Sequence, residues 1–101
     1  MEVKTVLLQT TTGGQRVPAH LVRGLAIHKR IKGDQYGGTW AVSHINTGLL
    51  VHWGFPTRKE AWGFALDISK LTDWNDIHDR ADCSVELGRE VQRIRSGYHW
   101  A

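Results

Sequence analysis

The clearest alternation of hydrophobic and polar positions lies between residues 39 and 74. Residues 40–45 and 49–53 each alternate β-forming side chains with small or polar ones, and Asn46-Thr47-Gly48 stands between the two runs. Asparagine tolerates turn geometry, and glycine supplies the positive φ that closes a three-residue hairpin loop. The pattern therefore predicts a β-hairpin in which Ile45 pairs with Leu49; a one-residue slip, which would exchange the faces of one strand, is the alternative.

A helix is predicted directly after this hairpin, from Thr57 to Leu71. Pro56 ends the second strand because a proline keeps the residue before it extended. Thr57 and Glu60 have the spacing of a capping box. Apolar residues then recur at three- and four-residue spacing in two stripes, Ala61, Phe64, Ala65, Ile68 and Leu71 in one and Trp62 and Leu66 in the other. Two stripes predict a sheet on one side of the helix and another helix on the other, with Gly63, Asp67 and Lys70 facing water.

The remaining segments predict more strands and a second helix. Residues 2–11 are rich in β-branched and apolar side chains, and residues 17–31 fit one long strand or two, bent at Gly24. A helix is predicted to begin after Asp82 or Ser84 and to end near Gly97. Its apolar stripe is Cys83, Leu87, Val91, Ile94 and Tyr98. The fold class expected is α+β: an antiparallel sheet of three to five strands, one helix packed on it, and a second, C-terminal helix. All of this forms a single domain over residues 1–101.

Composition narrows the class of protein. With 101 residues and 41% hydrophobic residues, the chain can bury one small core. Its apolar runs are too short to span a membrane, and its first residues lack the pattern of a signal peptide. The one cysteine, Cys83, excludes an internal disulfide and fits a reducing compartment. We therefore expect a cytoplasmic protein with no membrane partner, in which Cys83 is a small buried hydrophobe.

Charge is distributed unevenly along the chain. Residues 1–59 carry eight basic and two acidic side chains, whereas residues 60–101 carry five basic and eight acidic ones. The strand half is therefore basic and the helical half acidic. Such asymmetry favours a polyanionic partner on the sheet side, although chance clustering on a solvated surface also accounts for it.

Candidates for catalysis or metal binding are weak. The six histidines include no pair with the local spacing of zinc ligands, and the glycine pairs do not match a phosphate-cradling loop. The acidic run Asp73, Asp76, Asp79 and Asp82 is more typical of a solvated turn that enters a helix than of a magnesium site. The sequence predicts no metal, no cofactor and no enzymatic activity.

Nucleic-acid binding is the sharper hypothesis. Arginine and lysine side chains supply phosphate contacts, and aromatic side chains on a sheet can stack on bases or insert between them. The candidate binding residues are the four cations Arg23, Lys29, Arg30 and Lys32 and the rings of Tyr36, Trp40, His44 and His52. The alternative for Trp40 is an ordinary place in the core.

The segment from residue 25 to residue 71 resembles the plant ethylene-response-type DNA-binding domain and its phage-integrase and homing-endonuclease relatives. In that family three antiparallel strands precede a helix that opens with Gly-Phe-x-Thr-x-x-Glu-Ala. Here Gly54-Phe55-Pro56-Thr57-Arg58-Lys59-Glu60-Ala61 follows a hairpin that carries Trp40 and Trp53. The resemblance implies a three-stranded sheet that contacts DNA.

A second resemblance opens another class of function. The stretch Trp40-x-Val42-Ser43-His44-x-x-Thr47-Gly48-Leu49 is similar to small phage and mobile-element proteins of uncharacterised type. Small phage proteins often inhibit host defences, as anti-CRISPR proteins do. That resemblance implies an inhibitor that binds and blocks a host defence protein, as the alternative to a nucleic-acid-binding protein. The sequence also leaves a homodimer open.

Overall fold

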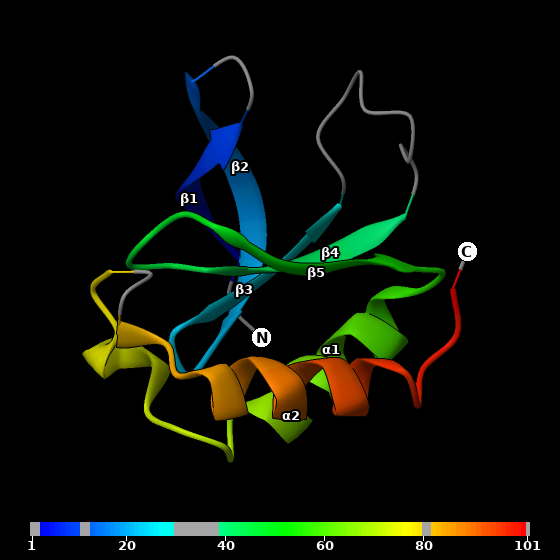
Figure 1. Cartoon of the computed structure of the whole chain (residues 1–101). Helices are drawn as coiled ribbons and strands as arrows, with labels where there is room; N and C mark the ends of the chain where they lie inside the picture. Colours follow the sequence, from blue (N-terminus) through cyan, green and yellow to red (C-terminus); the bar gives the residue numbers. More distant parts are fainter. Residues whose placement is uncertain (1–2, 11–12, 30–38, 80–81, 101) are drawn as a thin grey trace.

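The computed structural model describes residues 3–10, 13–29, 39–79 and 82–100. Five antiparallel strands form one sheet in the order of the chain: β1 (Val3–Thr10), β2 (Gly13–Val22), β3 (Leu25–Lys29), β4 (Trp40–His44) and β5 (Leu50–Phe55). Two helices and a short 3-10 turn follow: α1 (Arg58–Ile68), η1 (Trp74–Asp76) and α2 (Val85–Arg95). Figure 1 shows both helices on the same side of the sheet. The α+β class with a second, C-terminal helix is confirmed.

The run of residues 17–31 is two strands joined by a tight turn. Val22 pairs with Leu25, so only Arg23 and Gly24 connect β2 to β3. Both turn residues have positive φ, +47° for Arg23 and +87° for Gly24. These angles fit a type I′ turn, whose twist matches that of the strands it joins. The chain therefore reverses completely at Gly24, where the sequence indicated a bend.

The hairpin of β4 and β5 is present, but its predicted pairing of Ile45 with Leu49 is wrong. Ser43 pairs with Leu50 and Trp40 with Phe55, and the register shifts twice between these pairs. At the turn the His44 amide donates to the Leu49 carbonyl over 2.8 Å. Bulges insert extra residues into one strand of a pair, and strict alternation in the sequence does not reveal them.

Helix α1 begins at the predicted cap. The Glu60 amide donates to the Thr57 hydroxyl over 3.2 Å. The helix contacts β3, β4 and β5. Its first stripe is buried against the sheet, in a core that contains Leu25, Ile27, Val42, Phe55, Ala61, Phe64, Ala65, Ile68 and Trp74. The stripe was predicted to be buried, and this is confirmed for its four residues within the helix, Ala61, Phe64, Ala65 and Ile68.

The polar side of α1 is not open to water at Gly63 and Asp67, as the sequence analysis expected. The C-terminal tail folds back over it, and the Tyr98 hydroxyl donates to the Asp67 carboxylate over 2.5 Å. A Cβ on Gly63 would lie 3.1 Å from that hydroxyl. The local pattern of α1 carried no information about the tail, because the two segments are about thirty residues apart in the chain.

Helix α2 is capped by Ser84, whose hydroxyl accepts from the Leu87 amide over 3.0 Å. The helix packs alongside α1 and buries Val91. Cys83 was expected to be buried, and this expectation is wrong. It lies before the cap rather than on the helix, and it is exposed.

The other side of the sheet forms a second, smaller core. Because the sheet twists strongly, β1 and β2 rise out of the plane of the remaining strands (Figure 1). Apolar side chains are enclosed on the inner side of this curve, namely Val6, Leu8, Val17, Ala19 and Ala26, with Leu21 and Ile45 packed against them. The outer side of β1 and β2 is consequently a convex surface that lies outside this core, and only its Val22 end packs against the α1 core.

Candidate functional site

The convex outer side of β1 and β2 continues onto the ends of β3 and β4. Residues that pair directly across antiparallel strands share one face of the sheet. Leu7 pairs with Arg16, Thr5 with Pro18, and Lys29 with Trp40. His20 belongs to the same face because it pairs with Ile27, two residues before Lys29. We call this surface the open sheet face; it consists of Thr5, Leu7, Arg16, Pro18, His20, Lys29 and Trp40.

A cation and two rings stand together on the open sheet face. The Lys29 ammonium lies 5.8 Å from the centre of the Trp40 ring, within the range of a cation–π contact. The Trp40 ring is also 6.5 Å from the His20 ring, between ring centres, at an interplanar angle of 42°. Trp40 and His20 are half-buried, while Lys29 is exposed. The cluster therefore presents ring surface beside a hydrated positive charge.

Arg16 supplies a second exposed cation to this face, from the middle of β2. Among the residues that the structure describes, neither Arg16 nor Lys29 makes an ion pair with a carboxylate. Their charges are available to an external anion. Arg16 and His20 were not among the residues predicted from the sequence, because strand parity places them with Lys29 only once the turn at Arg23 is recognised.

The structure separates two of the cations that the sequence grouped. Arg23 lies in the turn before β3, whereas Lys29 is the last residue of that strand. Four residues of extended chain between Leu25 and Lys29 span about 13 Å, so the two side chains serve different surfaces. Arg30, Lys32 and Tyr36, the other candidates from this stretch, lie outside the described residues.

His44 is a structural side chain. It is 4% exposed, and its Nε2 donates to the Trp74 carbonyl over 2.6 Å. Its Nδ1 accepts from the Thr47 hydroxyl over 2.9 Å. Both nitrogens are engaged within the chain, so the ring fixes η1 against the β4–β5 turn.

His52 is also buried, under α2. Its Nε2 donates to the Gln92 side-chain oxygen over 2.9 Å, and its ring stacks on Trp53 with centroids 5.0 Å apart. Burial lowers the pKa of His52, with the nearby Arg95 charge acting in the same direction. His52 is 7% exposed in the fold.

A buried arginine, Arg95, connects the C-terminal tail to β5. The sequence did not predict its role. Arg95 is fully buried between the rings of Phe55 and Trp100, at 4.0 and 3.8 Å from their centres. Its guanidinium donates to the Trp53 carbonyl over 2.9 and 3.2 Å and to the Tyr98 carbonyl over 3.2 Å. Burial lowers the pKa of Arg95. No feature of the sequence marks this arginine, because its partners are backbone carbonyls.

Two residues of the acidic run after α1, Asp73 and Asp82, accept hydrogen bonds from nearby backbone amides. An Asp73 carboxylate oxygen accepts from the Asn75 amide over 3.0 Å. Asp82 likewise accepts from the amides of His78 and Asp79 at 3.0 and 3.1 Å. Within the described part of the chain, no cluster of three or more histidine, cysteine or acidic side chains could hold a metal ion. No helix in that part is long and apolar enough to cross a membrane.

Comparison with protein-family models, with curated proteins and with solved structures gave no match in any of the three searches. The resemblance of residues 25–71 to the ethylene-response-type domain and that of residues 40–49 to small phage proteins stay predictions.

Proposed function

We propose that this chain is a non-enzymatic nucleic-acid-binding protein that uses the open sheet face. The observation that carries the proposal is the Lys29–Trp40–His20 cluster, in which an exposed cation lies 5.8 Å from the ring of Trp40, which is half-buried at the edge of the α1 core. Phosphates bind lysine and arginine side chains, and bases stack on aromatic rings. Lys29 and Arg16 offer the first type of contact and Trp40 the second.

The charge distribution supports the same orientation. All eight acidic residues after position 59 are exposed or half-exposed, and they lie on α1, on α2 and in the segment between the two helices. Asp67 is one of them, and it accepts a hydrogen bond from Tyr98. A polyanion is repelled by these acidic segments and attracted by the cations of the strands. Such a field raises the rate of encounter and turns the open sheet face toward the nucleic acid.

The test measures the binding of random-sequence single strands and duplexes by fluorescence anisotropy at two salt concentrations. Wild type should bind at low salt and lose affinity steeply as salt rises, because phosphate binding releases condensed counterions. The double variant Arg16→Gln/Lys29→Gln should bind more weakly to every sequence. The matched control is Arg58→Gln/Lys59→Gln, which removes two exposed charges from the first turn of α1 and should bind as wild type does.

A protein partner is the second candidate, favoured by two exposed apolar side chains on β1. Val3 is 53% and Leu7 49% exposed, on the same side of the strand. Exposed apolar side chains that lie together are a common mark of protein interfaces. An inhibitor that blocks a host protein would use this surface. If wild type binds neither single strands nor duplexes at low salt, the nucleic-acid proposal is wrong, and nuclease-insensitive capture of a protein then supports this one.

A further inference from the structure

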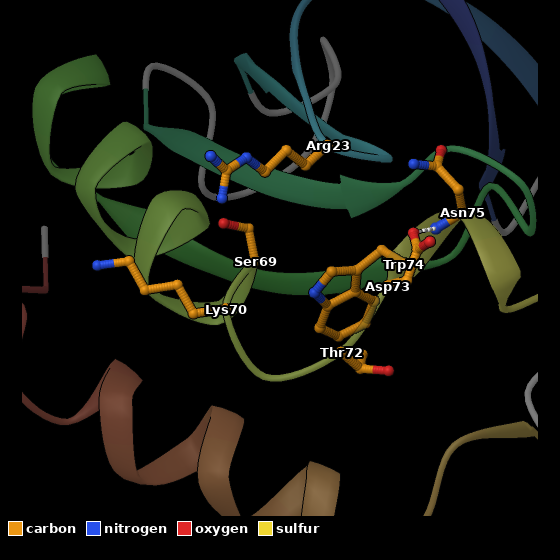
Figure 2. Close-up of a pocket in the computed structure, with 7 residues that line it drawn as sticks. All are labelled: Arg23, Ser69, Lys70, Thr72, Asp73, Trp74 and Asn75. Atoms are coloured by element: carbon orange, nitrogen blue, oxygen red, sulfur yellow. Dashed lines mark hydrogen bonds between the residues drawn. The ribbon is translucent and has the colours of Figure 1, made fainter.

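A hollow of about 360 Å³ lies at the opposite end of β3 from Lys29. Arg23 lines it from the β2–β3 turn, Ser69, Lys70 and Thr72 from the segment directly after α1, and residues 73–75 from η1 and its N-cap (Figure 2). The Arg23 side chain runs toward Ser69, and the Lys70 ammonium points to the same side of the view. Two stretches of the chain, the β2–β3 turn and residues 69–75, thus bring two cations to one hollow.

Both cations lack an internal partner. Neither Arg23 nor Lys70 makes an ion pair with any residue that the structure describes. Two like charges at one hollow repel each other, and a bound anion would offset that repulsion. The negative groups that face the same space are Asp73 and the carbonyl end of α1. An Asp73 oxygen already accepts from the Asn75 amide over 3.0 Å, and the formal charge of the lining side chains stays positive.

Arg23 also holds an unfavourable backbone conformation. Of the described residues other than glycine, it alone has a positive φ, +47°. The first position of a type I′ turn is normally asparagine, aspartate or glycine, since other side chains are strained there. Strain of this kind persists where the surroundings enforce it, and it concentrates at functional sites. An asparagine at this position would give a more stable turn, so Arg23 costs the turn some stability.

The turn and η1 are fixed against each other, so the hollow is formed in advance of any ligand. A Cβ on Gly24 would lie 3.1 Å from the Asn75 amide nitrogen, which leaves no space between the turn and η1. The Asn46 side chain donates to the carbonyls of Asn75 and Ile77, at 2.8 and 3.1 Å. His44 holds the Trp74 carbonyl from the other direction. A preformed site loses little conformational entropy when it binds.

We propose that this hollow binds a phosphate group between the Arg23 guanidinium and the Lys70 ammonium. Arginine matches the oxygens of a phosphate with two parallel hydrogen bonds, and lysine adds a compact positive charge. The phosphate comes from free phosphate, from a nucleotide or from the end of a nucleic-acid strand. The site does not include the open sheet face, so it stands whether or not that face binds nucleic acid.

The test is an NMR titration of the ¹⁵N-labelled full chain with inorganic phosphate, against sodium chloride at equal ionic strength. Phosphate should cause saturable shifts of the amides of Arg23, Gly24, Lys70 and Asn75, which chloride does not cause. Lys70→Gln should weaken binding by about tenfold or more, as expected for a lost hydrogen bond between charged groups. Asp73→Asn, which keeps an oxygen for the Asn75 amide, should strengthen it. Lys59→Gln, at the other end of α1, is the matched control and should change nothing.

Arg23→Asn separates this proposal from a purely structural role. The variant should raise the thermal midpoint by a few degrees, because asparagine suits the turn, and should abolish the phosphate-dependent shifts. If Arg23 instead serves to stabilise the carbonyl end of α1, the midpoint falls and the proposal is wrong. It is also wrong if wild type shows no saturable shifts, or if Arg23→Asn and Lys70→Gln retain them.

A second set of titrations, with different phosphate-containing ligands, shows which kind of phosphate the site binds. A mononucleotide and a short oligonucleotide with a 5′-phosphate are compared with the same oligonucleotide lacking it. A terminal-phosphate site binds the phosphorylated strand more tightly, and Lys29→Gln leaves that difference unchanged. Equal binding of inorganic phosphate and nucleotide assigns the site to the phosphate alone.

Discussion

Two clusters in this molecule combine a cation with aromatic rings, and they differ in how far water reaches the cation. Arg95 is fully buried between Phe55 and Trp100, and it donates to two backbone carbonyls. Lys29 lies over Trp40 at 5.8 Å with its ammonium in water. The first cation is used by the fold, and the second is available to a partner.

The difference shows why a count of charges and tryptophans does not locate a site. Both clusters contribute to the basic charge and to the five tryptophans of the chain. Burying an arginine requires hydrogen bonds that compensate for lost hydration, and the Trp53 and Tyr98 carbonyls provide them. An exposed lysine keeps its hydration and needs no such partner. Burial and hydrogen bonding, rather than residue type, therefore separate the structural cluster from the candidate interface.

The largest effect is expected from Phe64→Ala, which removes the ring beneath the buried cluster. Phe64 packs against Phe55 at 5.1 Å and against Tyr98 at 6.1 Å between ring centres, and it is fully buried. Truncating it should cost about 3–5 kcal/mol of unfolding free energy, measured by urea denaturation. The affinity of the remaining folded molecules for nucleic acid should not change. A mild loss of stability would contradict the assignment of α1 to the core.

Arg95→Lys tests the buried cation itself. Lysine has no planar fork to donate to the Trp53 carbonyl from two nitrogens, and it cannot stack between two rings as a guanidinium does. The variant should lose about 1–3 kcal/mol of stability, in the range for a buried hydrogen bond that is left unmade. The control is Arg89→Lys, an exposed position on the same helix, expected within about 0.5 kcal/mol of wild type. Equal effects at the two positions would show that Arg95 is not structural.

Local patterns predicted the elements that local chemistry determines. Thr57 marked the start of α1 and Gly48 the β4–β5 turn, and Ser84 was one of two residues predicted to cap α2, because caps and turns depend on a few neighbouring residues. The β2–β3 turn has Arg23 where a type I′ turn normally has asparagine, so the sequence did not predict a turn at this position. Missing that reversal grouped Arg23 with Lys29, which the structure places at opposite ends of β3.

Contacts between distant segments lay beyond the reach of sequence patterns. Tyr98 covers Gly63 and Asp67 through a tail that returns from the end of α2. Arg95 bonds to backbone carbonyls, which every residue possesses, so no partner residue type could signal its burial. For the candidate site, Lys29 and Trp40 were selected for their chemistry alone, and their proximity came only from the register of β3 and β4.

Replacing one tryptophan in each cluster by alanine sharpens the comparison between the two clusters. Trp40→Ala should weaken single-strand binding by about 1–3 kcal/mol, the range for loss of one base–aromatic stack. Trp100→Ala should lower stability, because Trp100 stacks on Arg95, and should leave binding by the folded molecules unchanged. Anisotropy titrations and urea midpoints of both variants give the four values needed. The distinction between the clusters fails if Trp100→Ala weakens binding as much as Trp40→Ala does.

A smaller effect is expected at high pH, from the tail that closes over the buried cluster. Burial and the hydrogen bond to Asp67 raise the pKa of Tyr98 from 10.0 to about 12. The folded state therefore holds this proton more tightly than the unfolded chain does. The resulting stabilisation is complete below pH 10 and is lost as pH rises through about 12. Urea midpoints of wild type minus those of Tyr98→Phe should decline over this interval, and a constant difference would exclude the linkage.

The central claim, that Lys29 is available to phosphates while Arg95 is not, is tested most directly by the salt dependence of binding. Affinity for a random single strand is measured at several salt concentrations for wild type, Lys29→Gln and the control Lys59→Gln. The slope of log affinity against log salt should fall by about 0.7 for Lys29→Gln, the value for one lost single-strand phosphate contact, and stay unchanged for the control. Equal slopes for all three proteins would contradict the claim.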